Sequence, residues 1–195
     1  MSSKRYVTVN FDPIRSAEFV NKIINNAKVK ASLIGTVRTW PELPPEAQLQ
    51  TKDLDMAVLQ EDTVWIEEAL NKANIPHAPC DIGGVSVDIP TQSIRVDFVD
   101  RRVEIESLFR EAVTVAYTVG DTINLGDNSL IATPLEYIVA MKLAPARDKD
   151  DIILDALLRH SEFDYNNARA IVLKHLGAAS AYRLDRMAKR AGRLK

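Results

Sequence analysis

The segment Thr51-Lys-Asp-Leu-Asp-Met-Ala-Val-Leu59 alternates polar and apolar residues as a half-buried β-strand does. Side chains of a strand point alternately to its two faces, so Leu54 and Met56 share a face that can lie on a core. Asp53 and Asp55 share the other face, with their Cα atoms about 7 Å apart. Two carboxylates this close repel each other unless a cation lies between them, and their hard oxygen atoms suit Mg²⁺ or Mn²⁺ better than Zn²⁺. The segment therefore predicts either a metal site or a solvent-facing edge strand, in which alternating aspartates are common.

A second predicted strand offers a third carboxylate. Ile94-Arg-Val-Asp-Phe-Val99 also alternates, with Asp97 as its one acid. If this strand pairs beside the first, Asp97 completes a three-carboxylate cluster that can hold two metal ions about 4 Å apart. Asp88 is the rival third acid, because it lies between apolar residues in a strand predicted over 85–89. That strand forms a hairpin with 94–99 through the turn Pro90-Thr-Gln-Ser93.

The rest of the chain alternates between helical and extended patterns before it becomes wholly helical. Predicted helices in the first part span 16–29 (with Ser16 as the N-cap), 62–73 and 104–112. Predicted strands span 31–34, 53–59, 85–89, 94–99, 113–119 and 122–125, and the proline-rich segment 40–45 is typical of a loop. Thr133-Pro-Leu-Glu136 combines an N-cap threonine with a proline at the first helical position, which predicts a helix start. Further helices are predicted over 149–160, 165–176 and 178–191, the last two separated by Gly177.

Strands interleaved with helices and followed by a helical end predict an α/β (α+β) fold. We expect a small mixed or antiparallel sheet flanked by helices over 1–132, and a helical region over 133–195 that packs on it. Of the 195 residues, 46% are hydrophobic and 27% charged, which is typical of a globular protein and excludes a disordered or collagen-like chain. No apolar run approaches the roughly 20 residues that span a bilayer, and the lone Cys80 cannot pair within the chain. We therefore expect a cytoplasmic protein that does not contact a membrane.

Charge is distributed unevenly along the chain. Residues 166–195 carry eight basic side chains and one acidic one, whereas the whole chain has a net charge of −2. Such a basic tail on an acidic body is typical of a nucleic-acid-binding end, or of a helix face that docks on the body.

Three features together resemble the nucleotidyltransferase superfamily of DNA polymerase β. They are the apolar strand that ends in Leu33-Ile-Gly-Thr36, the segment Asp53-Leu-Asp-Met56, and the isolated Asp97 on a later strand. The stretch Ile138-Val-Ala-Met-Lys-Leu-Ala-Pro-Ala-Arg-Asp-Lys-Asp-Asp151 is similar to the Lys…Arg-x-x-Asp stretch of AbiEii-like nucleotidyltransferases, some of which are toxins of toxin–antitoxin systems. The resemblance extends over roughly residues 33–158.

The resemblance implies a Mg²⁺- or Mn²⁺-dependent enzyme that transfers an NMP group from an NTP to an acceptor and releases pyrophosphate. Asp53 and Asp55 would bind both metal ions, and Asp97 would bind the catalytic ion and help to activate the acceptor hydroxyl. An RNA acceptor fits the basic tail, a protein or an antibiotic-type small molecule is an alternative, and an antitoxin partner is implied by the toxin–antitoxin branch. The rival from another class is a catalytically silent binding module with the same fold.

Other residues are expected to bind the phosphates. Backbone N–H groups near Gly35 and Thr36 can bind a triphosphate, because glycine lets the chain approach closely. The resemblance assigns Lys142 and Arg147 to nucleotide binding, and Asp150 to orienting Lys142 or accepting a proton from the acceptor. The alternatives are a lysine that snorkels to the surface and acids that only complement the dipole of the next helix.

Overall fold

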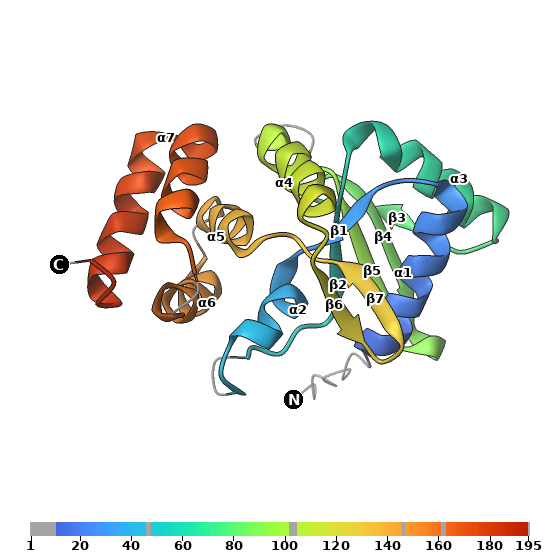
Figure 1. Ribbon diagram of the computed structural model, residues 1–195. Coiled ribbons are helices and arrows are strands. Elements are labelled where there is room, and N and C mark those ends of the chain that lie inside the picture. The colour runs from blue at the N-terminus through green and yellow to red at the C-terminus, as the bar shows by residue number, and fades with distance from the viewer. Residues whose placement is uncertain (1–10, 46–47, 102–104, 146, 161–162, 195) are drawn as a thin grey trace, which may run out of the picture.

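The computed structural model describes residues 11–45, 48–101, 105–145, 147–160 and 163–194. Within these residues a five-stranded mixed sheet lies at the centre, with helices on both faces (Figure 1). In spatial order the strands are β1 (Ala31–Leu33), β2 (Leu54–Val58), β5 (Ile94–Val99), β4 (Gly84–Ile89) and β3 (Ala78–Pro79). The strands β2 and β5 are parallel, and the other neighbours are antiparallel. The predicted α/β class with a small mixed sheet is therefore confirmed.

One face of the sheet is covered by α1 (Pro13–Ala27) and α3 (Thr63–Lys72) (Figure 1). The helix α1 begins where it does because the Asp12 carboxylate accepts hydrogen bonds from two N–H groups of the first turn, at 2.9 and 3.2 Å. A proline fits the first position, where its missing N–H has no partner within the helix. The predicted N-cap at Ser16 is thus wrong, and this residue is fully buried inside α1.

The other face carries α4 (Glu106–Val119), which corrects the prediction of a short helix followed by a strand over 113–119. The predicted start at residue 104 lies outside the described residues. Along the whole of α4 the buried residues follow helical spacing, and they are Leu108, Phe109, Ala112, Val113 and Ala116. The β-branched residues of its second half favour a strand locally, but the packing of this apolar stripe against β1 and β2 decides the conformation.

The chain continues through a separate hairpin into the C-terminal helices. These elements are β6 (Thr122–Leu125), β7 (Asn128–Ile131), α5 (Leu135–Leu143), α6 (Asp148–Arg159) and α7 (Tyr165–Arg190). Gly177 interrupts α7 with φ 80° and ψ 179°, so the two helices predicted on either side of it meet at a kink. Thr133 does not cap α5 as predicted, because Pro134 takes the N-cap position. The buried Thr133 hydroxyl instead hydrogen-bonds the Ser32 hydroxyl of β1 at 2.7 Å.

Short helical segments complete the fold. They are α2 (Gly35–Thr39), η1 (Trp40–Glu42), η3 (Gln60–Asp62) and η4 (Pro90–Gln92). The segment η1 lies within the predicted loop over 40–45, and η4 forms the turn predicted between β4 and β5.

The helices α5, α6 and α7 share one hydrophobic core with α4 and with residues of β2 and β5. Glu111 of α4 adds polar contacts to this junction. It accepts hydrogen bonds from Tyr137 of α5 at 2.9 Å, and from Lys174 and His175 of α7 at 2.5 and 3.0 Å. The boundary between residues 132 and 133 stays a prediction, because the core is continuous across it. The described helices include no candidate for a membrane span.

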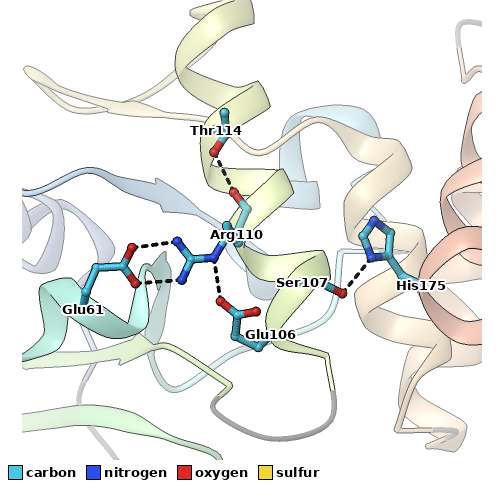
Figure 2. A network of polar contacts seen from close by, with 6 residues as sticks. All are labelled: Glu61, Glu106, Ser107, Arg110, Thr114 and His175. Atoms are coloured by element: carbon cyan, nitrogen blue, oxygen red, sulfur yellow. Dashed lines mark hydrogen bonds and ion pairs between the residues drawn. The ribbon is translucent and has the colours of Figure 1, made fainter.

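A second polar network surrounds the first turns of α4 (Figure 2). Arg110 binds the Glu61 carboxylate of η3 through two hydrogen bonds of 2.6 and 2.8 Å, and Glu106 through a third of 2.7 Å. Ser107 contacts His175 of α7 at 3.0 Å. These contacts fix α4 between the sheet and the C-terminal helices. The sheet and these helices form the walls of a cleft.

Candidate active site

Three aspartates lie together at one edge of the cleft. Asp55 on β2 lies directly beside Asp97 on β5 in the register of the parallel pair, and Asp53 immediately precedes β2. One carboxylate oxygen from each of the three lies within 4.8 Å of the others. The rival third acid, Asp88, is exposed on β4 opposite Arg95 and is not part of this cluster of described residues. The parallel pairing of β2 and β5 is therefore what brings the predicted acids together.

Two hydroxyl groups orient these carboxylates. Thr51 donates a hydrogen bond to Oδ1 of Asp53 at 2.9 Å, and Ser86 of β4 donates one to Oδ1 of Asp97 at 2.5 Å. Neither hydroxyl is among the predicted site residues. The signal for Ser86 was nevertheless present, since the predicted hairpin register places it opposite Asp97.

The electrostatics of the cluster suit a hard divalent cation. Burial raises the pKa of the Asp97 carboxyl above its ordinary value, and the negative charge of Asp53 acts in the same direction, while the Ser86 hydrogen bond opposes them. All three aspartates are half-buried and offer only oxygen ligands. This donor set fits Mg²⁺ or Mn²⁺, which prefer carboxylates, and lacks the nitrogen or sulfur ligands typical of zinc.

Gly35 brings the backbone directly against the acid cluster. It starts α2 with φ +70°, a conformation that favours glycine. A Cβ atom at this position would lie 2.0 Å from Oδ2 of Asp55, so no other residue fits without a shift. The preceding N–H, that of Ile34, donates to the Asp55 carbonyl oxygen at 2.9 Å. The predicted phosphate-binding turn, Gly35 and Thr36, thus lines the same cleft as the aspartates.

The opposite wall comes from α5 and the start of α6. Nζ of Lys142 lies 3.3 Å from Oδ1 of Asp150, and Nε of Arg147 lies 2.7 Å from Oδ2. The side chains of Lys142 and Asp150 are only 8% and 2% exposed, which excludes both a surface lysine and an acid that merely charges a helix end. Burial lowers the pKa of Lys142, while the negative charges of Asp150 and Asp55 oppose this effect. The cleft between the two walls has a volume of about 290 Å³.

The cleft has two further parts that were not predicted. Arg101, two residues beyond β5, lines it. The apolar part of the lining consists of Val99 of β5, Phe109 of α4, Ile138 and Met141 of α5, and the connecting residues Ile34, Ile82, Ile105 and Pro145. An apolar lining with a few convergent charged groups is typical of a small-molecule site.

Half of the basic tail is engaged within the protein. Ion pairs join Arg169 to Asp185, Lys174 to Glu111 and Arg183 to Asp151. Arg193 donates to backbone carbonyl oxygens at the end of α6 and just beyond it. These contacts favour the interpretation of the tail as a docked helix. The exposed basic side chains that remain among the described residues of the last turns are Arg186, Lys189 and Arg190, and Lys195 lies outside the described residues.

No protein-family model matches this sequence, and no curated protein matches it either. Among solved structures, the chain is similar to the solution structure of the antibiotic-resistance factor ANT(2'')-Ia, at 13% sequence identity and a TM-score of 0.42. The match covers 90% of this chain and 91% of that one. What the cleft does is therefore inferred from the residues that line it.

Proposed function

We propose that this protein is a metal-dependent nucleotidyltransferase, which transfers an NMP group from an NTP to an acceptor and releases pyrophosphate. The observation that carries the proposal is the cleft itself. One wall consists of three carboxylates and the backbone of Gly35, a position that only glycine fits. The other wall contains the buried ion pair of Lys142 and Asp150. Phosphoryl-type transfer needs positioning and charge neutralisation rather than a covalent intermediate, and these groups provide both.

In this proposal the aspartates hold the cations. Asp53 and Asp55 would hold both ions, and Asp97 would hold one of them and help to activate the acceptor hydroxyl. Divalent cations in such a site neutralise phosphate charge and favour deprotonation of a bound hydroxyl. Thr51 and Ser86 keep one oxygen of Asp53 and of Asp97 hydrogen-bonded, so the remaining lone pairs point to a defined position.

The phosphates are held by groups from both walls. Backbone N–H groups at Gly35 and Thr36 bind phosphate oxygens, and Lys142 donates to them from the other side. Both oxygens of Asp150 are already engaged by cationic side chains, so we assign this residue to orienting Lys142 rather than to accepting a proton. The acceptor hydroxyl gives its proton to the Asp97 carboxylate while its oxygen attacks the α-phosphorus. The bond from that phosphorus to the bridging oxygen breaks, and its electron pair leaves with pyrophosphate.

We infer RNA as the acceptor class, supported by the exposed basic side chains of the last turns of α7 and by exposed Tyr182 on the same helix. A toxin–antitoxin role in the cytoplasm, implied by the resemblance of the stretch from Ile138 to Asp151, belongs to the same proposal. Its alternatives remain an antibiotic-type acceptor and a silent binding module.

A labelling experiment tests the proposal. Protein is incubated with each α-labelled NTP and Mg²⁺ or Mn²⁺, together with total RNA, with a protein extract or with an aminoglycoside. Wild type is expected to transfer label to RNA, and chelation of the metal abolishes transfer. The double variant Asp53→Asn, Asp55→Asn should fold as well as wild type or slightly better, because two crowded carboxylates no longer repel each other, and it should transfer nothing.

The matched control is Asp88→Asn, which removes an exposed acid from a neighbouring strand and should transfer at the wild-type rate. Transfer by the double variant at the wild-type rate would contradict the metal-site assignment. Nucleotide binding without transfer to any acceptor would favour the silent module.

A further inference from the structure

Arg38 of α2 is a buried charge that the proposed reaction does not use. Its side chain is only 7% exposed, and it is not among the described residues that line the cleft. Burial lowers the pKa of its guanidinium, and the negative charge of Glu42 opposes this effect. Arginine nevertheless keeps its charge in proteins. A buried ion pair often adds less stability than apolar residues of the same volume, and what it can contribute is one fixed arrangement of the segments that it joins.

Arg38 joins α2 to the connection between β7 and α5. Its Nε donates a hydrogen bond to the carbonyl oxygen of Thr133 at 2.6 Å, and its Nη1 donates one to Oε1 of Glu42 at 3.3 Å. Thr133 immediately precedes Pro134, the N-cap of α5. The N–H group of Thr133 also donates to the Leu33 carbonyl oxygen of β1 at 3.1 Å. The first turn of α5 is therefore fixed by contacts with α2 and β1.

The helices α2 and α5 each carry part of the candidate site. Gly35, at the start of α2, lies against Asp55 on the wall that holds the acid cluster. Lys142 lies on the opposite wall, about two turns along α5 from its first residue. Protein interiors are closely packed and transmit small displacements, so a shift of the first turn of α5 would also move Lys142 relative to the acids.

Glu42 extends this contact to α6. Its second carboxylate oxygen, Oε2, lies 3.9 Å from Nε2 of His160, the C-cap of α6. The same helix carries Asp150, the buried partner of Lys142. The pair of Arg38 and Glu42 thus contacts the wall of Lys142 in two places, just before α5 and at the end of α6.

We propose that Arg38, together with Glu42, is a positioning residue that sets the separation of the two walls and so holds Lys142 at its working distance from the acid cluster. This inference rests on the proposed function, in which Lys142 donates to the phosphates. Arg38 does not touch the substrate and acts through Lys142. The acid cluster itself should not depend on Arg38, because β2, β5 and the hydroxyl groups of Thr51 and Ser86 hold it.

The double variant Arg38→Met, Glu42→Leu tests this assignment, because it removes both charges and keeps similar volumes. Its melting temperature should fall by about 2–8 °C, since the Thr133 carbonyl oxygen loses its donor. Calorimetric titration with Mn²⁺ should give wild-type affinity. The turnover number in the labelling assay should fall about a hundredfold, because a displacement of about 1 Å at a catalytic group costs that much. Arg38→Lys, which keeps the charge and a donor, should lose about tenfold.

Coupling to Lys142 separates positioning from a general effect on folding. Lys142→Gln, which keeps a donor for Asp150, is made in wild type and in the double variant. If Arg38 acts through Lys142, the double substitution should change the turnover number by less than about threefold once Lys142 is glutamine. The matched control is Arg159→Met, Asp155→Leu, which removes an exposed pair of the same i,i+4 spacing outside the cleft. It should transfer label at the wild-type rate.

The outcomes distinguish this inference from the proposed function. Wild-type protein that transfers no label overturns the proposed function, and the inference falls with it. Wild-type turnover by the folded double variant overturns the inference alone. An equal loss with lysine and with glutamine at position 142 also overturns it, as does a loss of Mn²⁺ binding, because the pair would then act on the whole fold or on the acids. If the double variant does not fold, Arg38→Lys undergoes the same comparisons and decides between the same outcomes.

Discussion

Substitution of Gly35 by alanine tests whether the first residue of α2 must lie against the acid cluster. At φ +70° an alanine costs about 1–2 kcal/mol relative to a relaxed conformation. Its Cβ would also lie 2.0 Å from Oδ2, 2.8 Å from Cγ and 2.9 Å from Cβ of Asp55. Rotation about χ1 removes the first two overlaps but leaves the third, so the backbone of β2 or of the turn must move. Overpacking of this kind adds about 1–3 kcal/mol.

Gly120 provides a matched control for Gly35→Ala. It has nearly the same backbone angle, φ +77°, but a Cβ there would meet no atom within 4 Å. Gly120→Ala therefore carries only the backbone cost, which lowers the melting temperature by about 2–8 °C in a chain of this size. Gly35→Ala should melt several degrees lower still, and it should lose roughly a hundredfold in transfer rate, because a displacement of about 1 Å at a catalytic group costs that much.

The two variants are compared by thermal unfolding and by the labelling assay, each with wild type alongside. Equal melting temperatures for Gly35→Ala and Gly120→Ala, with wild-type transfer by both, would refute the reasoning. A loss of transfer by Gly120→Ala as large as that by Gly35→Ala would refute it as well, since the effect would then come from lowered stability rather than from Asp55.

Three other perturbations test the walls and the tail. Lys142→Met should lower the free energy of unfolding in urea by about 3 kcal/mol, because it removes one of the two cationic partners of the buried Asp150 carboxylate. The control is Lys72→Met, which removes the exposed ion pair with Glu68 in α3 and should change the free energy of unfolding by about 0.5 kcal/mol or less. Glu111→Gln tests the pH dependence of stability. The hydrogen bond from the Lys174 ammonium holds the pKa of the Glu111 carboxyl below its ordinary value. The contribution of this carboxylate to the free energy of unfolding is therefore complete above the ordinary pKa, and it is lost as the pH falls through the lowered pKa. The melting temperature of wild type should therefore fall more steeply than that of Glu111→Gln below about pH 4.5, and parallel curves would contradict this. Glutamate in place of the exposed tail residues Arg186, Lys189 and Arg190 should weaken RNA binding and flatten its salt dependence by about 0.7 in log–log slope per lost contact, without changing NTP affinity. Unchanged RNA affinity would exclude the tail as the acceptor site.

The acid cluster could largely be derived from the sequence. Alternation along the segment from Thr51 to Leu59 places Asp53 and Asp55 on one face, and this depends only on the period of a strand. The hairpin of β4 and β5 was also evident, because its turn lies between two alternating segments of matched length. These features are local, so residues within a few positions of one another contain the information.

Other features were decided by packing between distant segments. Residues 113–119 form a helix rather than a strand because their apolar stripe completes a surface that covers the sheet. The burial of Lys142 with Asp150 depends on how α5 and α6 meet, and the contact between Gly35 and Asp55 depends on how α2 follows β1.

The sequence by itself therefore determined which residues are candidates for the chemistry, because their spacing along a strand or a helix sets the face on which they lie. The tertiary structure alone decided which of them share a cleft. Asp55 and Asp97 become neighbours through the parallel pairing of two strands that are far apart in the chain, and Arg101 reaches the same cleft in a strained conformation. No local sequence pattern specifies such contacts between distant segments, because they form only when whole helices and strands bury their apolar faces against one another.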